Sequence, residues 1–326
     1  MNNLPWLQPI WNQLVEYIEQ KRLPHALLIT GIPGIGKRLL AENFAQRLLC
    51  GNPAANGSAC NKCPSCLLYL AHTHPDYCVA EPAESGKMLP IDVIRKVINL
   101  LTLTPQYSGH RVVLLSPAHH MSVGAANSLL KTLEEPPDQS LIVLITEAPE
   151  LLSATIVSRC QRFHINTPTR QQGCAWLETK TKNKDCDSLL ALAQGGPFKA
   201  LGLANTKQLQ QRNESYQQWR CLGQFSADPV TVAEKWSKLP EDSILSWMMT
   251  WVVDMIRLRF HPDREDLFNV DLRSSLQADA NRLNLKQVFE FWESLLFAKM
   301  QYSTQINKLL LLEELLVKWC EMHRPI

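Results

Sequence analysis

The stretch Ile29–Leu40 reads Ile-Thr-Gly-Ile-Pro-Gly-Ile-Gly-Lys-Arg-Leu-Leu and constrains the fold more than any other part of the chain. A buried apolar strand leads into it and a helical pattern follows it. The spacing of Gly31, four residues, Gly36 and Lys37 matches the loop whose backbone amides cradle phosphates at a helix N-terminus. We therefore expect an α/β domain with a parallel sheet, in which Gly31, Gly34, Gly36 and Lys37 form a phosphate-binding loop.

Two parts of the magnesium site that should accompany this loop are missing. The residue after Lys37 should be Ser or Thr, whose hydroxyl holds magnesium, but it is Arg38, whose guanidinium has only donors. The apolar strand predicted over 111–115 should end in acidic residues, but Ser116 and Pro117 follow it. These losses predict that phosphoryl transfer at the chain's own loop is crippled.

Other polar residues near the predicted strand ends have more than one interpretation. His119 or His120 could act as a base, although packing or surface histidines are commoner. Thr146, at the tip of a buried strand, could contact a phosphate or simply end the strand. Arg159 follows a short helix predicted over 149–157, and it could be a surface residue or could stabilise a phosphoryl group, even across a subunit boundary. The residues alone leave these alternatives open.

Four cysteines indicate a metal site. Cys60, Cys63 and Cys66 have Cys-x2-Cys-x2-Cys spacing, and nine residues separate Cys50 from Cys60. Because zinc prefers four soft ligands in a tetrahedron and no position is left open, we expect a structural zinc bound by these four residues. The alternatives are a buried helical Cys50 with three free thiols, or a substitute ligand from the His-x-His at 72–74.

Length and composition describe an ordinary soluble protein. The 326 residues suggest two or three domains, and a net charge of +2 does not demand a nucleic-acid partner. The first nine residues lack the charged start and apolar run of a signal peptide, and no apolar run reaches the roughly 18 residues of a membrane span. These features predict a cytoplasmic protein whose ten cysteines are thiols or metal ligands rather than a disulfide framework.

Taken together, the motifs resemble the clamp-loader AAA+ ATPases of bacterial DNA polymerase III. Besides the glycine loop and the cysteines, the match includes His25-Ala26, the run Asn-Ser-Leu-Leu-Lys-Thr-Leu-Glu-Glu-Pro-Pro at 127–137, and Ser158-Arg159-Cys160. The motifs extend from about residue 20 to 205, and beyond that point the match is only in helical character.

The resemblance implies three domains. They are an AAA+ P-loop domain with an inserted four-cysteine zinc module over 1–166, a helical lid over 167–206, and an all-α collar for oligomerisation over 207–326. Helices are predicted in the last domain at 209–222, 229–238, 243–260, 286–300 and 305–322, and their tryptophans are expected to fill cores. Ring packing is expected to bury apolar residues of the final helix, namely Ile306, Leu309, Leu312, Leu316 and Trp319.

Within that family the motor subunits have intact nucleotide sites, whereas a stator subunit has a defective site and keeps the Ser-Arg-Cys arginine. The chain resembles the stator. A third departure agrees, because the lid motif Gly-Ser-x-Arg of the motors is replaced here by Gly195-Gly196-Pro197-Phe198, with Phe198 at the arginine's place. The resemblance implies that Arg159 is an arginine finger given in trans to a neighbouring ATPase, and that ATP binding by Gly31, Gly34, Gly36 and Lys37 is weak or absent.

The implied partners are the gamma and tau motor subunits and the delta subunit, in a hetero-pentameric ring that loads the sliding clamp on primer–template DNA. The chain would have little or no activity alone, as part of a DNA-directed DNA polymerase holoenzyme that is a nucleotidyltransferase as a complex. One alternative is a catalytically active motor subunit of the same fold. Another is a zinc-dependent DNA-binding module, which the lack of a dense basic stripe disfavours.

Overall fold

The computed structural model describes residues 4–54, 57–84, 87–107, 109–181, 186–239, 243–302 and 307–324. The chain forms two compact units, one of Met1–Trp176 with Gly195–Lys199 and the other of Leu177–Gln194 with Ala200–Ile326. The helices α7 (Arg170–Glu178) and α9 (Pro197–Asn205) are divided between these units. The three-domain division at residues 166 and 206 stays a prediction.

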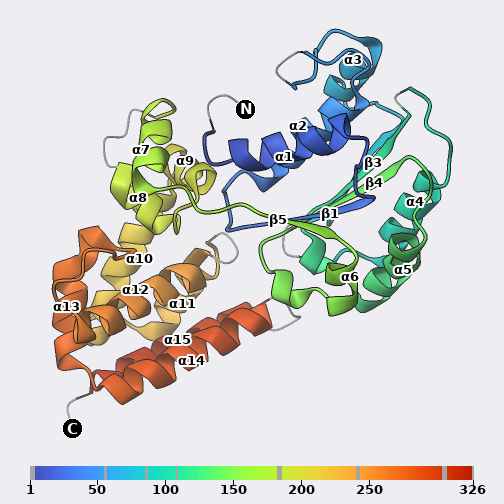
Figure 1. The fold of residues 1–326 in the computed structure, drawn as a ribbon. Coiled ribbons are helices and arrows are strands. Elements are labelled where there is room, and N and C mark those ends of the chain that lie inside the picture. Colours follow the sequence, from blue (N-terminus) through green and yellow to red (C-terminus); the bar gives the residue numbers. More distant parts are fainter. Residues whose placement is uncertain are drawn as a thin grey trace. The chain divides into compact units, whose positions relative to one another are not determined.

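Five parallel strands form the centre of the first unit (Figure 1). They are β1 (Ala26–Thr30), β2 (Tyr77–Ala80), β3 (Arg111–Leu115), β4 (Ser140–Thr146) and β5 (Gln161–His164). Their order across the sheet is β2-β3-β4-β1-β5. The three central strands are buried along their whole length, as continuous apolar runs require when both faces are covered. Because all pairs are parallel, the carboxyl ends meet at one edge, where such folds bind ligands.

Helices cover both faces of this sheet. In Figure 1, α1 (Gln8–Glu19) and α2 (Lys37–Leu49) lie on one side, and α4 (Ile91–Leu101), α5 (Val123–Glu134) and α6 (Ala154–Ser158) lie on the other. Alternate strand residues, such as Val113 and Ile142, share one buried core with Ile94, Leu129 and Ile156 of the second group. This core holds α5 and α6 in position against the sheet.

Two short helical segments of the first unit differ from the prediction. The single helix expected over 149–157 is wrong, because a short 3-10 turn, η2 (Pro149–Leu151), is separated from α6 by Leu152 and Ser153. The Ser153 hydroxyl accepts the Ile156 amide at 3.4 Å and so starts α6 as a new helix. An unpredicted helix, α3 (Pro64–Leu70), lies among the cysteines where only loop was expected.

The second unit is helical. Its remaining elements are α8 (Cys186–Leu192), α10 (Gln208–Gly223), α11 (Pro229–Trp236), α12 (Ser243–Phe260), a 3-10 turn η3 (Val270–Leu272), α13 (Arg273–Arg282), α14 (Leu285–Tyr302) and α15 (Lys308–Met322). Five of them match predicted helices closely, whereas α13 was not predicted, since its sequence is mostly polar. Residues 305 and 306 of the predicted final helix lie outside the described residues.

Tryptophans fill the core of this unit, as expected. Trp219 stacks on Trp319 with ring centroids 3.9 Å apart, and Trp236, Trp251 and Phe291 surround the pair. The indole of Trp319 donates to the Trp219 carbonyl at 3.1 Å. These side chains therefore support the packing of the helices.

Three apolar residues predicted to pack in the ring are instead used inside the unit. Leu312, Leu316 and Trp319 are fully buried in the same core. Leu309 is partly buried against this core, and Ile306 lies outside the described residues. The amphipathic pattern of α15 thus correctly predicted a buried face, but other helices of the same unit cover these three residues.

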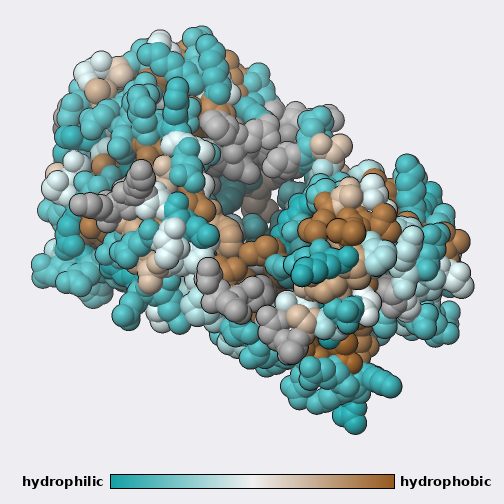
Figure 2. Space-filling view, turned by 90° about the horizontal axis from the view of Figure 1, so that it is seen from above, coloured by the Kyte–Doolittle hydropathy of each residue, from teal (hydrophilic) through white to brown (hydrophobic). Residues whose placement is uncertain are grey.

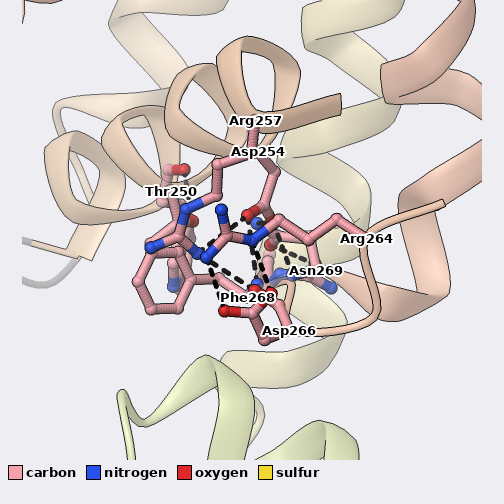
Figure 3. Close-up of polar contacts among 9 residues, drawn as sticks. Thr250, Asp254, Arg257, Arg264, Asp266, Phe268 and Asn269 are labelled. Atoms are coloured by element: carbon pink, nitrogen blue, oxygen red, sulfur yellow. Dashed lines mark hydrogen bonds and ion pairs between the residues drawn. The ribbon is translucent and has the colours of Figure 1, made fainter. Parts of the chain in front are cut away.

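A buried carboxylate anchors the connection between α12 and α13 (Figure 3). Asp254 accepts the amides of Phe268 and Asn269 at 3.1 and 2.7 Å, and the side-chain amide of Asn269 at 2.8 Å. The Arg257 guanidinium lies 4.5 Å from the Phe268 ring centroid. Asn269 in turn accepts from the buried Arg212 at 2.6 Å, so polar contacts help to fix this segment, in addition to the buried side chain of Leu267.

Among the described residues, no helix combines the length and the apolar character needed to cross a membrane. On the face shown in Figure 2, hydrophilic residues dominate and hydrophobic residues form smaller patches.

Candidate functional site

The glycine loop joins the carboxyl end of β1 to the first turn of α2. Gly34 and Gly36 have φ values of +69° and +100°, which residues other than glycine rarely adopt. Gly36 is the N-cap of α2, so the positive end of the helix dipole points at the loop. The expected strand–loop–helix arrangement is present.

The Lys37 ammonium points back into its own loop. Its Nζ donates to the carbonyls of Gly31 and Ile32 at 2.8 and 2.7 Å, and lies 3.3 Å from Oε1 of Glu147. Only 5% of the side chain is exposed. Burial lowers the pKa of Lys37, and the neighbouring Glu147 opposes that shift. All three donors of the ammonium therefore have partners within the protein.

Phe198 and Lys199, from the start of α9, lie against the glycine loop. The Phe198 amide donates to the Gly34 carbonyl at 2.8 Å. A Cβ atom placed on Gly34 would lie 2.5 Å from the Lys199 amide nitrogen, and one on Gly36 would lie 2.9 Å from the Phe198 ring. The backbone of Lys199 and the ring of Phe198 thus lie so close to the loop that neither glycine has room for a side chain.

Arg38 is tied to two carboxylates. Its Nε donates to Glu42 and its Nη1 to Glu81, both at 2.7 Å. Glu81 directly follows β2, so the guanidinium lies at the carboxyl edge of the sheet, where the magnesium-binding hydroxyl was expected. A cation already neutralises this acidic residue, and a donor-only group cannot bind a metal ion.

Polar side chains beyond β3 and β4 contact one another. His119 Nδ1 lies 2.9 Å from Thr146 Oγ1, which also accepts the Ala148 amide at 3.1 Å. Burial lowers the pKa of His119, and the neighbouring His120 lowers it further, so a neutral ring is favoured. Both side chains therefore have internal partners at the strand tips.

Arg159 lies at the opposite edge of the sheet. It is the C-cap of α6 and directly precedes Cys160 and β5, so it lies near the amino ends of the strands. Its Nη2 donates to Glu134 Oε1 at 2.6 Å and its Nη1 donates to the Thr155 carbonyl at 3.0 Å. About a third of the side chain, 32%, is exposed. The glycine loop follows the carboxyl end of β1, whereas Arg159 precedes the amino end of the neighbouring strand β5. Since β5 alone spans about 10 Å, Arg159 is too far away to contact a phosphate bound in its own glycine loop.

The four predicted metal ligands come together in space. Their sulfur atoms lie within 4.8 Å of one another. Cys50 is the C-cap of α2, Cys63 is the N-cap of α3, and Cys66 lies in the first turn of α3. A tetrahedral zinc site with Zn–S bonds of about 2.3 Å has sulfurs about 3.8 Å apart, so a small contraction of this cluster would hold such an ion.

Backbone amides prepare Cys60 to ionise. The amides of Lys62 and Cys63 donate to Cys60 Sγ at 3.5 and 3.3 Å. These hydrogen bonds lower the pKa of Cys60 to about 6, and the one from Lys62 has the largest effect. The thiolate is the form that binds a metal, so the surroundings of Cys60 favour a cationic ligand.

A buried hydrogen-bond chain holds the cysteine cluster to the domain. Ser65 donates to the Leu49 carbonyl at 2.6 Å and lies 2.8 Å from His74 Nε2. Since His74 Nδ1 accepts the Asp76 amide at 3.0 Å, the neutral ring carries its proton on Nε2. His74 is therefore occupied as a structural residue, and the cluster around a potential metal contains the four cysteines alone among the described residues.

Three carboxylates that contact these cations were not singled out from the sequence as their partners. They are Glu147 beside Lys37, Glu81 beside Arg38 and Glu134 beside Arg159. Glu147 and Glu81 directly follow β4 and β2, so in a parallel sheet both are expected at the carboxyl edge. Glu134 ends a helix that returns to the amino edge, where Arg159 lies.

Comparisons with known proteins agree with this arrangement. A sequence family described as "DNA polymerase III, delta subunit" matches residues 6–169, and "DNA polymerase III, delta subunit, C terminal" matches residues 206–321. The "DNA polymerase III subunit delta'" of Pseudomonas aeruginosa is 36% identical, with 98% of each chain covered. That of Escherichia coli is 32% identical, covering 96% of this chain and 94% of the relative.

A solved structure shares the fold. It is a DNA polymerase III gamma subunit-related protein from Thermotoga maritima, with a TM-score of 0.55 and 17% identity over 96% of this chain and 99% of the other. The predicted AAA+ fold with a helical C-terminal region is thereby confirmed. The sequence matches go further, and the chain belongs to the delta′ subunit family of the DNA polymerase III clamp loader.

Proposed function

We propose that this clamp-loader subunit turns over no ATP at its own glycine loop and acts on ATP through Arg159, in the site of a neighbouring motor subunit. The observation that carries the proposal is the location of Arg159 at the sheet edge opposite its own loop, with part of its side chain exposed. An arginine given in trans can accelerate phosphoryl transfer by about 10³–10⁵. That is roughly 4–7 kcal/mol of transition-state stabilisation.

The contacts around the loop support the loss of its own activity. Lys37 is engaged by two loop carbonyls and Glu147, so phosphates would have to displace these partners. Arg38 stands in place of a magnesium ligand. Phe198, at the place of a phosphate-binding arginine in the lid, donates only its backbone amide to the loop. We infer that ATP binding at Gly31, Gly34, Gly36 and Lys37 is weak or absent.

We propose that the partners are gamma or tau motor subunits and a delta subunit in a hetero-pentameric ring that loads the sliding clamp on primed DNA in the cytoplasm. The family assignment supports this, as does a 34% identity over 152 residues with the "DNA polymerase III subunit tau" of Bacillus subtilis. The proposal keeps residues 1–166 as the ATPase-like domain, 167–206 as the lid and 207–326 as the collar.

We further propose that Cys50, Cys60, Cys63 and Cys66 bind one structural zinc ion. Four thiolates and no open position are typical of structural zinc, and the clustered sulfurs and the low pKa of Cys60 fit that chemistry. The ion would fix the α2–α3 connection and would take no part in ATP hydrolysis.

Two measurements test the main proposal. The purified chain should hydrolyse MgATP no faster than buffer, and magnesium-dependent turnover that Lys37→Ala abolishes would instead identify an active motor subunit. Motor and delta-type subunits are then mixed with sliding clamp and primed DNA, with and without this chain. DNA-dependent ATP hydrolysis should rise when the chain is added, and an unchanged rate would refute a role in the ring.

A further inference from the structure

Arg159 is held from two directions by groups on different helices. Glu134, the last residue of α5, accepts from Nη2 at 2.6 Å, and the Thr155 carbonyl of α6 accepts from Nη1 at 3.0 Å. Neither charged side chain is buried, with 49% of Glu134 and 32% of Arg159 exposed. An exposed ion pair of this kind contributes little to folding stability.

The helices do not depend on this ion pair for their positions. Leu133, beside Glu134, is 1% exposed, and Ile156 and Cys160, on either side of Arg159, are 0% and 8% exposed. All three belong to one apolar core. The core therefore fixes both backbones, and the contact between Glu134 and Arg159 mainly sets the direction of the guanidinium.

We propose that Glu134 is a positioning residue for Arg159. It would hold the guanidinium in the orientation in which it meets the phosphoryl group of the neighbouring subunit, and this inference rests on the function proposed for Arg159 above. An arginine has five N–H donors, of which Glu134 and Thr155 occupy two, so three remain for phosphoryl oxygens. Glu134 can thus orient the arginine without competing for the donors that act on the nucleotide.

Orientation of Arg159 by Glu134 would lower the entropic cost of reaching the transition state. A free arginine side chain samples many rotamers, and ordering it at each encounter with the nucleotide costs conformational entropy. A side chain already oriented by a carboxylate avoids part of that cost in the transition state. Removal of Glu134 should therefore slow hydrolysis without weakening ATP binding, because binding depends on the neighbour's own loop.

The test uses the reconstituted complex with clamp and primed DNA, and measures kcat and KM for ATP. Glu134→Ala should lower kcat at the site that Arg159 serves about tenfold, equivalent to about 1.4 kcal/mol, with KM unchanged. Glu134→Gln keeps an acceptor oxygen and should retain at least a third of the wild-type kcat. Glu135→Ala removes the adjacent exposed carboxylate and should match wild type. Arg159→Ala gives the lowest rate, and adding Glu134→Ala to it should change nothing further.

Each outcome is decisive. If Arg159→Ala lowers kcat but Glu134→Ala equals Glu135→Ala, Glu134 does not position the arginine, and the proposed function survives. A higher kcat in Glu134→Ala would show that the carboxylate restrains Arg159, which also overturns the inference. If Arg159→Ala itself has no effect, the trans role fails and the inference fails with it. Urea unfolding of the isolated variants checks that Glu134→Ala folds like wild type.

Discussion

Substitution of Gly34 by alanine tests whether the start of α9 covers the glycine loop. Gly34 has a φ of +69°, and a Cβ atom there would lie 2.5 Å from both the amide nitrogen and the Cβ of Lys199. Neither atom is the end of a flexible side chain, so the backbone around Lys199 must move. That movement would stretch the 2.8 Å hydrogen bond from the Phe198 amide to the Gly34 carbonyl.

The expected loss of stability follows from these terms. A left-handed conformation costs alanine about 1–2 kcal/mol, and forcing an extra carbon against packed backbone costs about 1–3 kcal/mol. Alanine also lowers the conformational entropy of the unfolded chain, which stabilises the folded protein by about 0.4–1 kcal/mol. Gly34→Ala should therefore lower the free energy of unfolding by about 1–5 kcal/mol in urea denaturation, and hydrogen exchange at the Phe198 amide should accelerate.

Gly202→Ala is the matched control. Gly202 lies in α9 and an added Cβ meets no atom within 4 Å. Alanine is the better helix former, so this variant should gain about 0.5–1 kcal/mol with Phe198 exchange unchanged. Wild-type stability and wild-type Phe198 protection in Gly34→Ala would refute the close cover of the loop.

Two further predictions concern the cysteine cluster and the second unit. Elemental analysis should find about one zinc per chain, lost in Cys60→Ser, and a folded metal-free protein would refute the zinc proposal. Asp254→Ala leaves the amides of Phe268 and Asn269 without their acceptor, and should destabilise the protein by about 2–4 kcal/mol in thermal or urea unfolding. Exposed Asp263→Ala is the control, and an equal effect of both changes would show that burial of Asp254 is unimportant.

The sequence predicts the sheet well because its strands are unambiguous. β3 has the predicted bounds, since it is a continuous apolar run that ends at a turn or loop signal. The short helices were harder to predict. α3 has only seven residues and was hidden by the metal-ligand spacing, and a serine cap within 149–157 divides what read as one helix.

The candidate site was predictable in its residue types and not in its contacts. The spacing of the cysteines was enough to predict their clustering, because a two-residue gap brings thiols together locally. The inward direction of Lys37 depends on backbone carbonyls, which a sequence does not display. The pairing of Glu134 with Arg159 joins residues far apart in the chain, and only the packing of α5 against α6 shows it.

The central claim is that the chain's own loop is inactive while Arg159 acts on a neighbour, and one paired assay tests it directly. Lys37→Ala and Arg159→Ala are each placed in the reconstituted complex, and ATP hydrolysis is followed at saturating ATP with clamp and primed DNA. Lys37→Ala should keep the wild-type rate, whereas Arg159→Ala should slow hydrolysis at the neighbouring site by about 10³-fold or more. A rate that falls with Lys37→Ala and is unchanged with Arg159→Ala would contradict the account.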